Sequence, residues 1–276
     1  MAQFTTITSV FVSTPIIYTY KDNISSCFHD ASDNSPAATA PPLTGEALWP
    51  GTTNMINNFL SHLPNHTDSY KPTSFLELGA GVGIASIFLK LSALRTTSIV
   101  CTDGEPSLVT LIEQNSLLNP PLHNSNTLTP SQLWFGENPP ISANNNSPIY
   151  DVVFACDVLY DGHKPEFIDL LFKTVSFSLF GKLLQTLTDS VADPITFVEV
   201  WDLPTFSLAN ENDPGSIFLL AFGRRGVRIE DIFKSAIVHN LACLGVVEDS
   251  VYDVFDNNTD GVTDIWKDLI LAFGKA

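Results

Sequence analysis

A glycine-rich turn is the first feature of this sequence that could do chemistry. Residues 75–83 read Phe-Leu-Glu-Leu-Gly-Ala-Gly-Val-Gly, an apolar strand pattern that runs into a cluster of glycines. Because glycine has no Cβ, such a turn can bend sharply and let a ligand approach the backbone. In α/β proteins ligands bind at the carboxyl ends of the strands, where this turn would lie. The pattern indicates a ligand site, with a plain strand–helix turn as the alternative.

An acidic residue, Asp103, ends the next strand pattern. A carboxylate at that place accepts hydrogen bonds from ribose hydroxyls, although it could instead cap the following helix. The dinucleotide fingerprint requires a third glycine where Ile84 stands, and Gly83 comes one position early. Asp103 therefore indicates a nucleoside-containing cofactor without choosing which one.

Glu77 favours S-adenosylmethionine over a dinucleotide. A carboxylate buried beside the turn is costly unless it is paired. The cationic amino-acid end and the sulfonium of S-adenosylmethionine would pair with it, whereas a pyrophosphate would be repelled. The expected cofactor-binding residues of this unit are Glu77, Gly79, Ala80, Gly81, Gly83 and Asp103.

Strand and helix patterns alternate around these residues. Strands are expected at 74–78, 98–102, 132–135, 151–156 and 217–222, and helices at 84–94, 105–118, 166–180 and 229–242. Apolar residues with helical spacing predict another helix over 55–63. Segments 246–254 and 265–273 are expected to form a closing antiparallel pair. The alternation predicts an α/β fold with a mostly parallel seven-stranded sheet, helices on both faces and right-handed crossovers.

The chain is expected to divide into an N-terminal extension, residues 1–44, and one domain, residues 45–276. Residues 4–20 are rich in Thr, Val, Ile, Phe and Tyr and predict a hairpin in the extension. Within the domain, the Pro- and Asn-rich residues 138–148 predict a loop. Residues 181–215 are expected to be an insertion that contains a possible extra strand at 195–201.

Composition limits the possible partners and compartments. The 30 acidic residues outweigh 13 basic ones and give a net charge of -17, which repels phosphate backbones and disfavours nucleic-acid binding. This charge is compatible with a basic protein substrate. Cysteines stand far apart without C-x-x-C pairs, and no metal-ligand spacing occurs among the histidines, so we expect reduced thiols and no metal site. Without a signal, a transit peptide or an apolar run of membrane length, we expect a soluble, monomeric protein of the cytoplasm or nucleus.

Several motifs in order resemble methyltransferase family 16, a group of class I methyltransferases rich in protein-lysine methyltransferases. The resemblance runs from residue 45 to about 242. Residues 45–51, Gly-Glu-Ala-Leu-Trp-Pro-Gly, resemble the segment before the first core strand, whose tryptophan, here Trp49, packs near the cofactor. Residues 75–83 and 102–105 match the first and second motifs. Asn115 and Asn119 resemble the asparagines around the end of the next helix.

Three later segments extend the resemblance. Residues 133–137 resemble the family's Leu-x-Trp-Gly-acidic segment, whose tryptophan packs against the adenine. In this sequence Phe135 occupies the position of that tryptophan, and Trp134 lies one position earlier. Either ring could therefore pack against the adenine. Residues 155–160 match Ala-Asp-x-x-Tyr with Cys156 in place of the alanine. Arg224 and Arg225 resemble an arginine pair at the end of a late strand.

The resemblance implies the Rossmann-like class I methyltransferase fold, S-adenosylmethionine as cofactor and a protein substrate with an accessible lysine. It assigns Asp157 to binding or orienting the amine and Tyr160 to an aromatic wall, although Asp157 could instead cap a helix or turn and Tyr160 could be a core aromatic. Further cofactor contacts are expected from Trp49, Trp134, Phe135 and Cys156. Alternatives are methylation of a small amine or another protein side chain, since the same core serves many acceptors, and a non-catalytic binding module.

Overall fold

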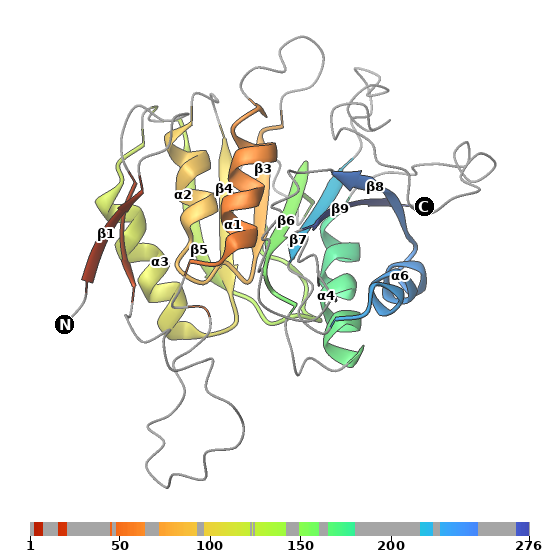
Figure 1. Ribbon diagram of the computed structural model, residues 1–276. Coiled ribbons are helices and arrows are strands. Elements are labelled where there is room, and N and C mark those ends of the chain that lie inside the picture. Colours follow the sequence, from red (N-terminus) through yellow and green to blue (C-terminus); the bar gives the residue numbers. More distant parts are fainter. Residues whose placement is uncertain are drawn as a thin grey trace, which may run out of the picture.

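A seven-stranded sheet runs through the centre of the protein (Figure 1) in the order β5-β4-β3-β6-β7-β9-β8. The computed structural model describes residues 3–7, 16–20, 45, 48–63, 72–92, 97–121, 123, 125–141, 149–159, 165–179, 216–222, 227–247 and 269–275. The strands of the sheet are β3 Ser74–Leu78, β4 Ser98–Asp103, β5 Thr127–Gln132, β6 Val152–Cys156, β7 Ile217–Phe222, β8 Leu241–Val247 and β9 Leu269–Lys275.

Strand directions confirm the predicted fold class. β9 is antiparallel to both of its neighbours, β7 and β8, and every other pair in the sheet is parallel. After β3 the chain adds β4 and β5 on one side and then returns to place β6 on the other side of β3. The strand order therefore reverses between β3 and β6, and ligands bind beside such a reversal, at the carboxyl edge of the sheet.

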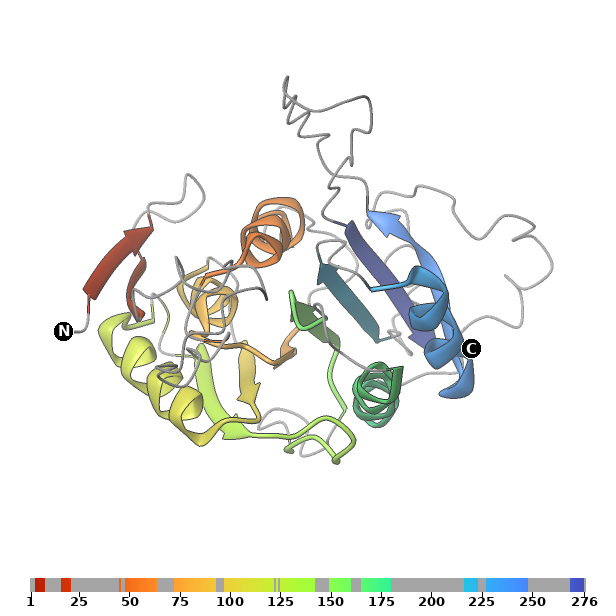
Figure 2. The same cartoon turned by 60° about the horizontal axis from the view of Figure 1, so that its bottom comes forward.

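Helices cover both faces of this sheet. They are α1 Pro50–Met55, which continues into the π-helical turn η3 Ile56–Leu60, α2 Ile84–Leu91, α3 Pro106–Leu118, α4 Pro165–Ser178 and α6 Ile229–Val238. Figure 2 shows α1 and α2 on one side of the sheet and α4 on the other.

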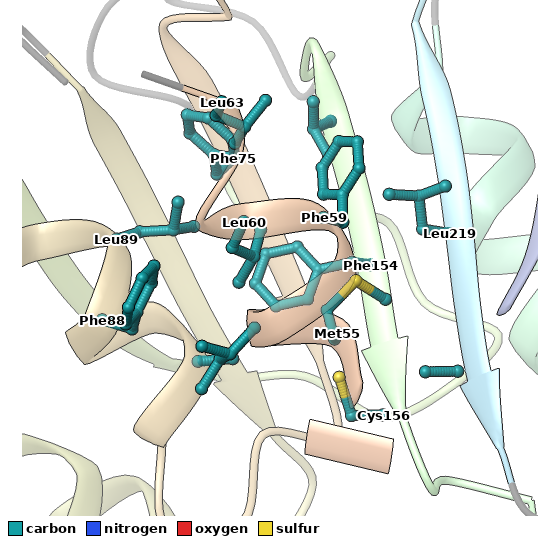
Figure 3. Close-up of a cluster of buried hydrophobic side chains, with 14 of the residues drawn as sticks. Met55, Phe59, Leu60, Leu63, Phe75, Phe88, Leu89, Phe154, Cys156 and Leu219 are labelled. Carbon is teal, nitrogen blue, oxygen red and sulfur yellow. The ribbon is translucent and has the colours of Figure 1, made fainter. Parts of the chain in front are cut away.

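Alternate residues of the strands belong to two buried apolar clusters, one on each face of the sheet. Phe75, Phe154 and Leu219 point toward α1, η3 and α2, where they meet Met55 and Phe59 (Figure 3). The residues between them on the strands, among which are Leu76, Val153 and Phe218, pack against α4 and α6. The strands β3, β4, β6 and β7 are thus buried on both sides, as the strand–helix alternation predicted.

Three elements have boundaries that differ from the sequence-based prediction: β5, α6 and α2. The strand expected at 132–135 is wrong: β5 covers 127–132, and Leu133, Trp134 and Phe135 follow it. β5 reads Thr-Leu-Thr-Pro-Ser-Gln, and its proline and polar residues are tolerated because it is an edge strand. The helix expected to reach 242 ends at Val238, because Asn240 turns the chain with φ 56° and β8 begins at Leu241. α2 also ends early, at Leu91 rather than at 94, where the Ser92 hydroxyl donates to the Leu89 carbonyl.

A separate two-stranded sheet precedes the seven-stranded sheet along the chain. β1 Gln3–Ile7 pairs antiparallel with β2 Ile16–Tyr20, and β2 lies next to α3. The expected insertion at 181–215, with its possible strand at 195–201, and residues 142–148 of the expected loop lie outside the described residues. Among the helices of the described ranges, none has both the length and the apolar character needed to cross a membrane.

Candidate active site

The glycine-rich turn lies where β3 ends and α2 begins. Gly79, Gly81 and Gly83 have φ values of 64°, 56° and 79°, in the left-handed region that side chains with a Cβ rarely adopt. The Ala80 amide donates to the Thr102 carbonyl at 2.8 Å, which fixes the turn to the end of β4. The sequence patterns therefore placed the turn correctly at the carboxyl edge of two neighbouring strands.

Gly45 packs directly on this turn. A Cβ at Gly81 would lie 2.5 Å from the carbonyl oxygen of Gly45, closer than any real contact. The segment that precedes α1 is thus in backbone contact with the turn. This contact gives a structural reason for the glycine at position 81, while at position 45 a Cβ would lie 2.4 Å from Leu108 Cδ1.

Asp103 ties the turn to the start of α3. Its side chain is buried, with Oδ2 accepting from the Gly81 amide and Oδ1 from the Glu105 amide, each at 3.0 Å. Burial raises the pKa of this carboxyl, and the two amide hydrogen bonds oppose that rise. Glu105 is the N-cap residue of α3, and its amide lies ahead of the helical amides that need an acceptor. Asp103 therefore holds the loop before α3, and the helix-capping role considered for it is not observed.

Glu77 points into the layer between the sheet and α2. Its exposed fraction is 2%, and its Oε2 accepts from the Ser86 amide at 3.1 Å and from the Ser86 hydroxyl. The Cys101 thiol lies 3.6 Å from the same oxygen. Burial raises the pKa of Glu77 to about 7. The carboxylate therefore has partners within the protein, and its pairing with a cofactor stays a prediction.

Trp134 and Phe135 reach the edge of the sheet from β5, on two sides of the site. Trp134 stands over Gly104, the residue after Asp103: a Cβ at Gly104 would lie 2.7 Å from Trp134 Cε3. Half of the Trp134 side chain is exposed. Phe135 lies beside Gly79 instead and packs edge-on against Phe167 at 5.0 Å between ring centroids.

Asp157 follows β6 and meets the start of α1. It is 8% exposed and has a left-handed backbone, φ 53°, which is unusual for a residue other than glycine. Its amide donates to the Ala221 carbonyl at 2.8 Å, and its Oδ2 accepts from the Gly51 amide. Trp49 is the residue that precedes α1. Asp157 thus caps α1 and stands at the same edge of the sheet as the glycine-rich turn.

Cys156 differs from Asp157 in the direction of its side chain. It lies in the apolar cluster under α1, near Met55 (Figure 3), and burial raises the pKa of its thiol well above the usual range. Cys156 is therefore a buried residue of the core. Its contact with a cofactor stays a prediction. Tyr160, Arg224 and Arg225 lie outside the described residues.

Several residues support the site without having been predicted to do so. Ser86 holds Glu77, Gly51 holds Asp157, and Val158 Cγ1 fills the space that a Cβ at Gly79 would need. Asn115, which the resemblance singled out, donates to the Val82 carbonyl at 3.0 Å. One signal for Ser86 was available: it is the third residue of a helix whose first amides need acceptors.

The site suits a ligand that has a nucleoside part. The carboxylate of Asp103 ends a strand, the exposed ring of Trp134 lies beside it, and the glycine-rich turn offers backbone next to both. A nucleoside can stack its base on an aromatic ring and donate hydrogen bonds from its ribose hydroxyls to a carboxylate at the end of a strand. In the described ranges, no three or more His, Cys, Asp or Glu side chains are arranged to hold a metal ion.

A family model described as lysine methyltransferase matches residues 42–189. Among curated proteins, none matches this sequence.

Three solved structures illustrate the structural similarity. A TehB-like SAM-dependent methyltransferase from Corynebacterium glutamicum is 12% identical, with 82% of this chain and 88% of that chain covered and a TM-score of 0.46. Magnesium protoporphyrin IX methyltransferase from Synechocystis, with bound SAM, is 14% identical, with 82% and 80% covered and a TM-score of 0.46. A ribosomal protein L11 methylase from Lactobacillus delbrueckii is 16% identical, with 74% and 71% covered and a TM-score of 0.38.

Proposed function

The chain belongs to the lysine methyltransferase family, and from this membership we propose that it is a protein-lysine N-methyltransferase. It is a methyltransferase whose cofactor is S-adenosylmethionine. The observation that carries the finer proposal is Asp157, a buried carboxylate oriented by the Gly51 amide at the carboxyl edge of the sheet. A carboxylate at this place suits an acceptor that arrives as an ammonium ion.

The cofactor would be held along the edge formed by β3 and β4. We assign the ribose hydroxyls to Asp103 and the adenine to the space beside Trp134 and Phe135, with the glycine-rich turn at the amino-acid end. When bound, the cofactor supplies a methyl group on a positively charged sulfur. The protein contributes alignment, because the transfer is an in-line displacement that needs the nucleophile held on the axis of the breaking bond.

A lysine nucleophile must lose its proton before it can attack, because its pKa in water is about 10.4. Asp157 would accept a hydrogen bond from the arriving ammonium and orient the nitrogen toward the methyl group. Desolvation in the site, beside a positive sulfur, lowers the pKa of the amine and releases its proton to water. The Gly51 amide keeps the Asp157 carboxylate in one orientation during this exchange.

The net charge of -17 supports a cationic acceptor. A negative protein attracts basic segments from a distance and repels acidic ones, which raises the encounter rate with lysine-bearing substrates. Small amines share that attraction, so the charge favours amines in general, and family membership favours lysine in a protein.

Transfer of a radiolabelled methyl group from S-adenosylmethionine to a cell extract tests the proposal. We expect label on discrete protein bands with the wild-type protein. The Asp157→Asn variant, which keeps an acceptor for the Gly51 amide but removes the charge, should lose roughly 100-fold or more of the rate. Glu113→Gln, which neutralises an exposed carboxylate on α3, serves as the control and should label at the wild-type rate.

Label confined to the small-molecule fraction would contradict the protein-lysine proposal and favour a small amine as acceptor. Full activity of Asp157→Asn would remove Asp157 from the reaction.

A further inference from the structure

Glu77 connects the two ends of the glycine-rich turn. It belongs to β3, just before the turn, while its partner Ser86 belongs to the first turn of α2, just after it. Oε2 of Glu77 accepts from both donors of Ser86, the amide at 3.1 Å and the hydroxyl. One carboxyl group therefore joins the strand that leads into the turn to the helix that leaves it.

The surroundings of Glu77 do not favour a permanent negative charge. Among the described residues, the groups that act on it are Ser86, Cys101, Asp103 and Cys156, and none of these carries a positive charge. Burial raises its pKa to about 7, so the carboxyl is partly protonated at neutral pH. A carboxyl group keeps an oxygen that accepts hydrogen bonds in both protonation states, so the contact with Ser86 does not require a charge on Glu77.

Other residues fix the remaining parts of the same turn. Thr102 accepts from the Ala80 amide, Asp103 accepts from the Gly81 amide, and Asn115 donates to the Val82 carbonyl. These contacts hold the turn against β4 and α3. The contact between Glu77 and Ser86 links β3 to the first turn of α2, which the Ile87 amide also holds to the Gly83 carbonyl at 3.0 Å. Loss of the Glu77 contact removes the side-chain link between β3 and α2.

We propose that Glu77 is a positioning residue that clamps β3 to α2 through Ser86, and thereby shapes the glycine-rich turn, rather than pairing with the ammonium group of the cofactor. This inference rests on the S-adenosylmethionine-binding part of the proposed function and is independent of the methyl acceptor. The two roles predict different losses of binding affinity when Glu77 is replaced. Loss of a clamp weakens the binding of every ligand that contacts the turn. Loss of a counter-ion weakens the binding only of ligands that carry the ammonium group.

Calorimetric titration with two ligands separates these roles. S-adenosylhomocysteine carries the amino-acid end, and 5′-methylthioadenosine has the same nucleoside and a thioether but lacks that end. We expect Glu77→Ala to weaken both ligands by a similar factor, about tenfold. Ser86→Ala removes one of the two donors and should weaken both by about threefold. Glu77→Gln keeps an oxygen acceptor for Ser86 and should bind both ligands within about twofold of the wild-type affinity.

Ser178→Ala is the matched control, because Ser178 is a buried helical serine of α4, on the opposite face of the sheet, whose hydroxyl donates to the Thr174 carbonyl. It should leave both affinities unchanged. If Glu77→Ala does not fold, Ser86→Ala and Glu77→Gln decide the question by themselves.

Two results would overturn the clamp. One is a loss of affinity for S-adenosylhomocysteine in Glu77→Gln with unchanged affinity for 5′-methylthioadenosine, which identifies a counter-ion. The other is wild-type affinity for both ligands in Ser86→Ala and Glu77→Ala. Failure of the wild-type protein to bind either ligand would contradict the cofactor itself and the clamp with it. A protein that binds both but methylates no lysine would contradict only the acceptor.

Discussion

At the scale of single residues, Glu77 makes the stability of the protein depend on pH. Its pKa is about 7 in the folded state against a reference of 4.5, so between these values the folded protein binds more protons than the unfolded chain. The free energy of unfolding must therefore fall as the pH rises from about 5 to about 8, by roughly 3 kcal/mol from this group. We expect Glu77→Gln to lack this component.

Urea unfolding at pH 5 and at pH 8 measures the contribution of Glu77 to the pH dependence of the unfolding free energy. The difference in unfolding free energy between the two pH values should be smaller in Glu77→Gln than in the wild-type protein, while Glu113→Gln should keep the wild-type difference. Identical pH dependence in all three proteins would show that the Glu77 carboxyl titrates normally.

Trp134 provides a second test at this scale. Its half-exposed ring lies over Gly104 and beside Asp103, whereas Phe135 packs against Phe167 and lies next to Gly79. If Trp134 stacks on the adenine, Trp134→Ala should weaken S-adenosylhomocysteine by about 1–3 kcal/mol, the range of base–aromatic stacking. Trp134→Phe should recover most of that loss. Unchanged affinity in Trp134→Ala, measured by calorimetry, would assign the adenine wall to another residue.

Motif order predicted where the site residues fall along the chain, and it could not predict their partners. Asp103 and Asp157 follow buried strands as expected, but Asp157 meets Gly51 across 106 positions of sequence. The partner of Glu77 could have been anticipated, since a helix begins at Ile84 and its third residue, Ser86, needs an acceptor. The direction of the Cys156 side chain, toward the cluster under α1, follows from strand alternation with Phe154.

At the scale of elements, α3 holds the glycine-rich turn through Asn115. This side chain is fully buried and donates to the Val82 carbonyl. Asn115→Ala removes that donor and leaves the buried carbonyl without it, which costs about 1–3 kcal/mol of unfolding free energy. We also expect weaker binding of S-adenosylhomocysteine, because the turn is less well fixed. Gln114→Ala, on the exposed side of the same helix, is the control.

Urea unfolding and calorimetry on the two α3 variants check this prediction. A loss of stability with unchanged cofactor affinity would show that Asn115 supports the fold and does not shape the turn.

The elements that sequence patterns placed best are those buried on both faces. β3, β6 and β7 are buried along their whole length, and their bounds were predicted within one residue. β5 was missed because an edge strand needs neither apolar residues nor the absence of proline, so Pro130 and its polar neighbours read as a loop. The end of α6 was misjudged because apolar residues continue from the helix into β8 across the turn at Asn240.

At the scale of the whole molecule, the sheet order brings the residues that we propose for the cofactor and for the acceptor to one edge. β3 and β4 carry the glycine-rich turn and Asp103, and β6 carries Asp157 on the other side of β3. Gly45, ahead of α1, contacts the turn, and Gly51, in the first turn of α1, contacts Asp157. This arrangement is what a transfer between a bound donor and an arriving amine requires.

Identification of the methylated group tests the central claim most directly. The wild-type protein is incubated with radiolabelled S-adenosylmethionine and a cell extract, the labelled protein is hydrolysed to amino acids, and the label is separated by chromatography. We predict that it migrates with N-methylated lysine and that Asp157→Asn removes this signal. Label on any other amino acid, or equal methyl-lysine from the Asp157→Asn variant, would contradict the assignment of a protein-lysine N-methyltransferase that orients its acceptor with Asp157.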